Sequence, residues 1–187
     1  MIVTVWWEDE RKSVQSKLYG PHTILAACVA DELGLSPGDV LRRFVSVPKK
    51  GAGKLLRALA TDARQLQLGP LCAVLDRDHV LDHVALEHRT ASCTSGMRDA
   101  IRAHVDGPYY LVLLTDNMES LVEEAARALG RSEQLRKRPT VRDDVLQALA
   151  FHHDPAKRAA VRAAVDGFDR LVRWTAGQLD GLRSASR

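Results

Sequence analysis

Residues 109–125, YYLVLLTDNMESLVEEA, begin with six apolar or aromatic residues and continue into an amphipathic pattern. The apolar run has the length of a β-strand, and the absence of alternating polar residues predicts that both of its faces are buried. The second part predicts a helix over about 118–129 that ends at Gly130. A fully buried strand followed at once by a helix is typical of a parallel sheet covered by helices.

The same order of strand and helix occurs in the rest of the first 130 residues. Further strands are predicted at 2–7, 40–47 and 71–75, and further helices at 22–33, 54–65 and 95–105. Arg42 and Arg43 make the strand at 40–47 the weakest of the four. The alternation predicts an α/β fold with a small parallel, Rossmann-like sheet of about four strands flanked by helices.

From Thr140 onward the sequence predicts helices only. One helix is expected over 141–151 and another over 155–179, with Asp154 as its N-cap, a break at Gly167 and fraying ends over 181–187. We therefore expect an α/β domain at 1–130 and a helical C-terminal extension at 131–187 that packs on it.

Composition favours a cytoplasmic globular protein. The 187 residues contain 45% hydrophobic and 27% charged residues, and no apolar run approaches the roughly 20 residues that span a bilayer. The N-terminus lacks the pattern of a signal peptide. Cys28, Cys72 and Cys93 are scattered and odd in number, which predicts reduced thiols.

Charge divides the chain into two parts. The 61 residues from Arg127 onward contain 13 basic and 7 acidic residues, a net of +6, whereas the first 126 contain 14 basic and 17 acidic residues, a net of −3. This asymmetry is compatible with a cation bound by the first part and a polyanion bound by the second. Solvated arginine-rich helix faces would give the same counts.

Acidic residues follow three of the four predicted strands. They are Glu8, Asp9 and Glu10, then Asp76 and Asp78, then Asp116 and Glu119. Because the carboxyl ends of parallel strands meet at one edge of a sheet, we expect these side chains to converge. Clustered carboxylates repel one another unless a cation neutralises them, and oxygen ligands favour Mg²⁺ or Mn²⁺. Helix caps and solvated loops are the ordinary alternative.

A stretch rich in metal-ligand residue types follows the third strand. His79 and His83 have the i, i+4 spacing that puts two side chains on one helix face, but neither an HExxH glutamate nor a nearby cysteine completes a zinc site. A polar active-site loop, with one of these histidines as a general base or phosphate contact, and a plain surface turn both stay open.

Lysines and glycines precede the predicted helix at 54–65, in the sequence KKGAGK at 49–54. Glycine-rich turns at helix N-termini expose N–H groups to anions, and Lys49, Lys50 and Lys54 add positive charge. The spacing is not that of a Walker A loop. The segment predicts contact with a nucleic-acid backbone, and an ordinary turn between strand and helix is the alternative.

The motifs IVTVWWEDE, PKKGAGKLL, CAVLDRD and YYLVLLTDNMESLVEEA, with the tail VDGFDRLVRW, resemble those of TOPRIM-domain proteins. The resemblance is closer to small bacterial proteins related to the nuclease part of the overcoming-lysogenization-defect (OLD) family. It implies that Glu8 is the first metal-site glutamate, that Asp76 and Asp78 form the DxD motif and that Glu119 is a fourth acid. The family usually has Gly after the first glutamate, where this chain has Asp9.

The family implies Mg²⁺-dependent phosphodiester chemistry and, in several members, a separately encoded ATPase partner. Our leading interpretation is a TOPRIM-type nuclease or nuclease subunit that acts on DNA or RNA. Glu8, Asp76 and Asp78 would hold Mg²⁺ or Mn²⁺, and Glu8 or His79 would serve as base. The alternatives are a catalytically silent partner of an ATPase and a hydrolase of small phosphates. Association into a homo-oligomer stays open.

Overall fold

The computed structural model describes residues 2–8, 20–62, 69–78, 80–84, 91, 93–114 and 117–184. Its strands are β1 (Val3–Trp7), β2 (Phe44–Pro48), β3 (Leu71–Asp76) and β4 (Tyr109–Leu114). They form one sheet in the order β2-β1-β3-β4, and each neighbouring pair is parallel. The predicted fold class, a small parallel sheet of four strands flanked by helices with a helical C-terminal part, is confirmed.

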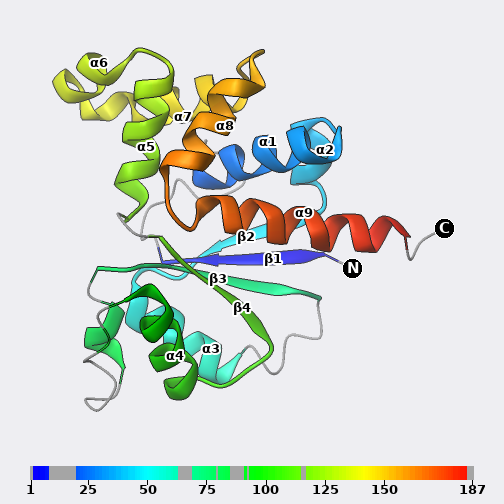
Figure 1. Cartoon of the computed structure of the whole chain (residues 1–187), viewed down its shortest axis with the longest axis vertical. Helices are drawn as coiled ribbons and strands as arrows, with labels where there is room; N and C mark the ends of the chain where they lie inside the picture. The colour runs from blue at the N-terminus through cyan, green and yellow to red at the C-terminus, as the bar shows by residue number, and fades with distance from the viewer. Residues whose placement is uncertain are drawn as a thin grey trace.

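Helices cover both faces of the sheet (Figure 1). One face carries α3 (Ala52–Thr61) and α4 (Thr94–His104). The other face carries α1 (Pro21–Leu33), α2 (Pro37–Leu41), α5 (Asn117–Ala128), α6 (Ser132–Lys137), α7 (Arg142–Ala150), α8 (Pro155–Ala164) and α9 (Phe168–Ser184). Short 3₁₀ segments also occur between these elements, among them η2 (Val80–His83) and η4 (Pro139–Val141).

The strands bury alternate side chains in two separate cores. On the side of α1, the core includes Val5 and Trp7 of β1 together with Val74 of β3. On the side of α3 and α4, the second core includes Trp6 of β1 and Ala73 of β3. Successive strand side chains point to opposite faces, so a strand enclosed between two helical layers has to be apolar throughout.

The strand order creates a switch point beside β1. The chain passes from β1 through α1 to β2 on one side, and then through α3 to β3 on the other side. Connections that leave β1 and β3 therefore diverge to opposite faces of the sheet. In open α/β sheets this place, outside the carboxyl ends of the strands, is where ligands bind.

The prediction of a strand beginning at residue 40 was wrong. The Ser36 hydroxyl accepts a hydrogen bond from the Asp39 N–H at 3.1 Å, and Pro37 occupies the first helical position, so the chain forms α2 instead. The β2 strand begins only at Phe44, after a turn at Arg42 and Arg43. A capping serine followed by proline determined the local structure here.

The C-terminal helices follow the predicted order with two differences. The break at Gly167 is confirmed, but α6 and η4 were not predicted. The helix α9 continues to Ser184, five residues beyond the predicted end at 179, and fraying of the last residues stays a prediction. Residues of α7, α8 and α9 share one core with α1 and β1. The domain boundary near residue 130 stays a prediction.

Ion pairs tie α8 to the C-terminal end of α1. The Arg158 guanidinium donates two hydrogen bonds to Asp31, at 2.6 and 2.7 Å, and another to the His152 carbonyl at 2.5 Å. Arg162 lies 2.8 Å from Glu32 and 2.6 Å from Asp169. Acidic residues of the first part of the chain thus neutralise arginines of the basic second part.

The three cysteines are free thiols. Cys28 and Cys72 are buried, and burial raises the pKa of Cys28 to about 12, whereas Cys93 is exposed. None of the described helices is both long and apolar enough to cross a membrane.

Gly167 lies where α9 approaches the sheet, with φ of +85°, and a Cβ atom there would lie 2.2 Å from the Leu113 carbonyl oxygen. We expect Gly167→Ala to lower the free energy of unfolding by about 2 kcal/mol or more, because it combines strain at positive φ with a backbone clash. Gly177→Ala, at an open position of α9, should raise it by about 0.5–1 kcal/mol. Urea denaturation measures both, and a Gly167→Ala protein as stable as the parent would contradict the packing of α9 on β4.

His22 in the first turn of α1 is 5% exposed, and its Nδ1 atom has no hydrogen-bond partner among the described residues. Burial lowers the pKa of His22 from 6.5 to about 4. The unfolded chain therefore binds a proton that the folded chain does not, and stability present above pH 6.5 should fall as the pH decreases toward 4, by on the order of 3 kcal/mol. In His22→Leu this contribution should vanish from the pH dependence of urea denaturation. Equal pH dependence in parent and variant would disprove it.

Candidate metal and nucleic-acid site

The candidate site lies at the carboxyl edge of the sheet, on the left of Figure 1. In a parallel sheet each strand delivers its following residues to the same edge, so Glu8 after β1 and Asp76 at the end of β3 become neighbours. β1 and β3 are adjacent strands up to this edge. Trp7 is paired with Val74, and the Glu8 N–H donates to the Val74 carbonyl at 3.0 Å.

The Glu8 carboxylate joins two segments that follow it in the chain. Its Oε2 atom accepts a hydrogen bond from the Asp76 N–H at 2.8 Å, and its Oε1 atom accepts one from the Ala52 N–H at 3.2 Å. Ala52 is the first residue of α3, whose N-cap, Gly51, has no side chain to cap it. Glu8 therefore caps α3 from β1 and anchors the end of β3 at the same time.

The loop before α3 is shaped to reach Glu8. Lys50 has φ of +59°, the left-handed region that non-glycine residues rarely occupy, and Gly51 has φ of +109°. This conformation lets the Gly51 N–H donate to the Glu8 carbonyl at 2.6 Å, while the next N–H, of Ala52, reaches the Glu8 side chain. Strain at Lys50 is offset by these bonds, as is common where a functional residue is held in place.

The two aspartates of the DxD motif differ in exposure. Asp76 is half-buried and Asp78 is exposed in the turn that follows β3. The Arg77 N–H donates to the Leu114 carbonyl at 2.8 Å and so extends the pairing with β4 by one residue. Within the described residues, no three Asp, Glu, His or Cys side chains come close enough together to hold a metal ion.

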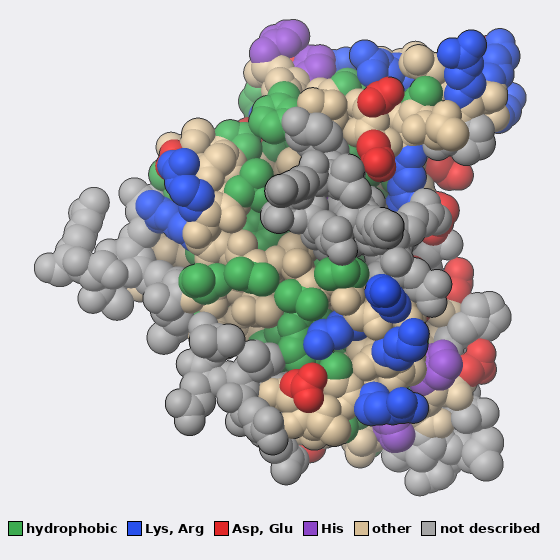
Figure 2. All heavy atoms as spheres, turned by 180° about the vertical axis from the view of Figure 1, so that it is seen from behind, with side chains coloured by type: hydrophobic (Ala, Val, Ile, Leu, Met, Phe, Trp, Pro, Cys, Tyr) green, Lys and Arg blue, Asp and Glu red, His purple; other side chains and the backbone are tan. Residues whose placement is uncertain are grey.

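Of the three lysines in and beside the loop before α3, one interacts with neighbouring side chains and two are exposed. The Lys49 ammonium lies 3.7 Å from the centre of the Trp6 ring and 3.9 Å from Asp62. Lys50 and Lys54 are exposed, as is Arg57 one turn further along α3. Figure 2 shows basic side chains gathered over this face of the molecule, with histidine beside them.

One histidine of the predicted pair lies against α3. A Cβ atom on Gly53 would lie 3.0 Å from Nδ1 of His83, so the exposed imidazole sits beside the first turn of this helix. The sequence suggested His83 as a zinc ligand with His79 or as a general base or phosphate contact, and its position against α3 was not predicted. His79, Asp9, Glu10 and Asp116 lie outside the described residues.

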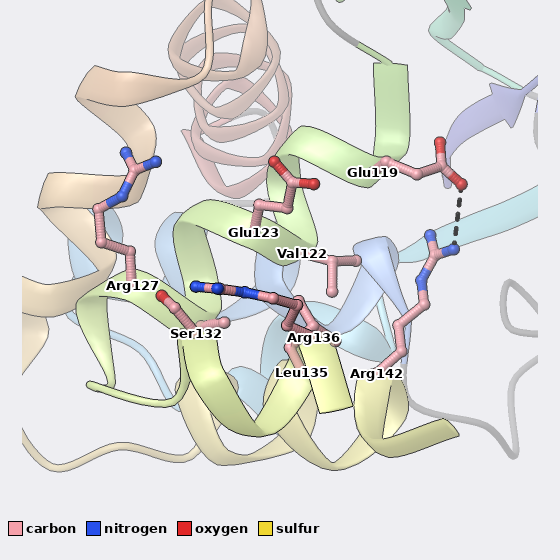
Figure 3. A pocket seen from close by; sticks show the side chains of 9 residues that line it. Glu119, Val122, Glu123, Arg127, Ser132, Leu135, Arg136 and Arg142 are labelled. Carbon is pink, nitrogen blue, oxygen red and sulfur yellow. Dashed lines mark hydrogen bonds and ion pairs between the residues drawn. The ribbon is translucent and has the colours of Figure 1, made fainter. Parts of the chain in front are cut away.

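Glu119, the predicted fourth acid, lies in the first turn of α5, and its side chain is 48% exposed. It accepts a hydrogen bond from Arg142 of α7 at 3.4 Å, at one end of a pocket (Figure 3). No sequence motif pointed to Arg142. Its pairing depends on how α7 packs beside α5, which local pattern does not reveal.

Comparison with known proteins finds similarity in structure only. No protein-family model matches the sequence, and no curated protein is similar to it. Two structures of the C-terminal region of the OLD protein of Xanthomonas campestris pv. campestris, phased with platinum and with iodine, are similar over 98% of this chain and 94% and 96% of theirs. Their TM-scores are 0.38 and 0.37, with 13% and 14% identity.

Both structures come from the OLD protein, whose family the sequence motifs resemble. At these TM-scores the likeness assigns no role to any residue of this chain.

The hydrogen bonds of Glu8 predict a stability effect that is independent of any bound ion. Glu8→Gln replaces one acceptor oxygen by an amide donor, which would face a backbone N–H, so we expect the free energy of unfolding to fall by about 1–3 kcal/mol. Glu133→Gln, which removes one partner of an exposed pair with Lys137, should change it by less than about 0.5 kcal/mol. Urea denaturation in EDTA compares the two, and equal effects would contradict the anchoring role of Glu8.

Proposed function

We propose that the chain performs metal-dependent phosphodiester chemistry on nucleic acid, as a TOPRIM-type nuclease or nuclease subunit. The observation that carries this proposal is the position of Glu8. Its carboxylate bridges the end of β3 and the start of α3 at the switch point of the sheet, directly beside Asp76. A carboxylate fixed by two backbone donors has little freedom left to lose when it binds a cation.

The donor set fits Mg²⁺ or Mn²⁺. Mg²⁺ is commonly bound by only one or two carboxylates together with waters and substrate phosphates, so a group of three protein ligands is not required. A carboxylate offers about four acceptor positions, which makes backbone hydrogen bonds compatible with coordination. Glu8 and Asp76 would hold the ion directly, and Asp78 and Glu119, predicted from the sequence as further acids, would act on it through bound water. When bound, the ion would lower the pKa of a water molecule and polarise the phosphate.

The exposed basic residues of α3 would position the substrate. Lys50 and Lys54 stand beside the same loop that reaches Glu8, where their charges would attract phosphates of a DNA or RNA strand. Lys49 would contribute chiefly to the fold, because its ammonium is engaged by Trp6 and Asp62. The assignment of Glu8 or His79 as base stays a prediction.

A second candidate is an interaction protein that keeps the fold and acts with a separately encoded ATPase. The ion pairs between α8 and α1 favour this second candidate. They neutralise arginines of the basic second part of the chain, which would otherwise be available to bind a polyanion. Both candidates place the protein in the cytoplasm of a bacterium, and neither fixes the number of subunits.

Asp76→Asn tests the metal site, because it keeps the size of the side chain but removes its charge. We expect the parent protein to melt at a higher temperature with Mn²⁺ than with EDTA, and to cut single- or double-stranded DNA or RNA only with the ion. The variant should lose both responses and be slightly more stable in EDTA, since repulsion near Glu8 decreases. Asp99→Asn, at an exposed position of α4, is the matched control and should behave like the parent.

The outcomes separate the candidates. A variant that keeps the Mn²⁺ shift and cuts like the parent would remove Asp76 from the site. A parent that shows the Mn²⁺ shift but cuts none of the substrates would favour the partner of an ATPase.

A further inference from the structure

A pocket of about 500 Å³ lies between α5, α6 and α7 (Figure 3). This volume lies within the range of small-molecule sites. Three arginines line it, one from each helix: Arg127, Arg136 and Arg142. Figure 3 shows Arg142 and Glu119 paired at one end, Arg127 at the opposite end and Arg136 between them.

Arg142 is a nearly buried cation with incomplete hydrogen bonding. Its side chain is 11% exposed, and one guanidinium nitrogen contacts Glu119 at 3.4 Å. The Nε and Nη2 atoms are buried and have no hydrogen-bond partner among the described residues. Because an unpaired buried donor costs free energy, and more so in a charged group, an additional anion near this guanidinium would be stabilised.

Arg136 provides a second, accessible positive charge. It is exposed, and it forms none of the ion pairs found in the described residues. Arg127 pairs with Glu124, which does not line the pocket. Figure 2 shows basic side chains concentrated at this corner of the molecule, over the region of α6. Guanidinium groups bind phosphate through paired N–H donors, so the pocket is suited to a phosphate.

The other residues that line the pocket indicate which chemical groups the phosphate would carry. Leu135 is partly exposed and, with the small accessible part of Val122, gives the pocket an apolar surface, which inorganic phosphate would not use. Glu119 and Glu123 are acceptors that would repel a second acidic group but accept hydrogen bonds from hydroxyl or amino groups. Phosphate, a flat apolar body and sugar hydroxyls occur together in a nucleotide.

We propose that this pocket binds one nucleotide unit, with its phosphate toward Arg136 and Arg142 and its base against Val122 and Leu135. A free mononucleotide and the 5′-phosphorylated end of a strand share this chemistry. The proposal goes beyond the nuclease assignment and does not depend on it, because neither a metal ion nor cleavage is involved.

The test is isothermal titration calorimetry of the full chain with 5′-AMP, in EDTA and at low salt. We expect 5′-AMP to bind more tightly than adenosine or inorganic phosphate, and Arg136→Gln to weaken binding about tenfold or more, the loss of one charge-assisted contact. Arg138→Gln, an exposed position just past α6 and outside the pocket, should bind like the parent. Arg142→Gln should also weaken binding. If that variant does not fold, the result for Arg136→Gln alone tests the proposal.

Two further ligands distinguish the sources of the nucleotide. A 5′-phosphorylated dinucleotide that binds as tightly as 5′-AMP, while the unphosphorylated one does not, supports recognition of a strand end. Binding of 5′-AMP alone supports a free nucleotide. The proposal is overturned if 5′-AMP binds no better than inorganic phosphate, or if Arg136→Gln and Arg138→Gln have equal effects.

Discussion

The burial of β1 on both faces is the constraint on which the other elements depend. Val3, Val5 and Trp7 are enclosed by the layer that contains α1, and Trp6 by the layer that contains α3. A strand without a solvent-facing side requires hydrogen-bonded neighbours on both edges and helices on both faces. Parallel neighbours in turn require crossover connections, which carry the chain to opposite faces from β1 and β3. The gap between these connections is where Glu8 emerges.

Because of its position, Glu8 stabilises the fold and is also suited to bind a metal ion. At the edge of the sheet its carboxylate satisfies the uncapped start of α3 and the Asp76 N–H, which otherwise would need other acceptors. The same bonds hold the carboxylate in one orientation, so its contribution to stability and its suitability as a metal ligand have one origin. For this reason the loss of activity in a Glu8 variant would not by itself identify a ligand.

The fold was largely predictable because its signals are local and strong. Residues 109–114 and 71–75 are apolar throughout, and the break at Gly167 follows from a glycine with positive φ in a helical pattern. The prediction of a strand at 40–47 was wrong at its start because Ser36 and Pro37 begin a helix. They are a stronger local signal than the β-branched residues that follow. The sequence placed Glu8 and Asp76 at one edge. It did not reveal that Glu8 caps α3, since this depends on the positive φ of Lys50 and Gly51.

Ion pairs between residues far apart in the sequence could not be predicted from local patterns. They change what the numbers of acidic and basic residues imply about binding partners. The chain has an acidic first part and a basic second part, which by composition alone suggested two different partners. In the structure, Asp31 and Glu32 of α1 meet Arg158 and Arg162 of α8, so part of the asymmetry is neutralised inside the protein. What matters for recognition is therefore the set of cations left incompletely paired. Among the described residues such cations include those on the outer side of α3 and those that line the pocket between α5, α6 and α7, and the second group lies beside a concave, partly apolar surface. An open basic face suits a polymer that is held along its backbone, whereas a concave pocket suits a single small unit.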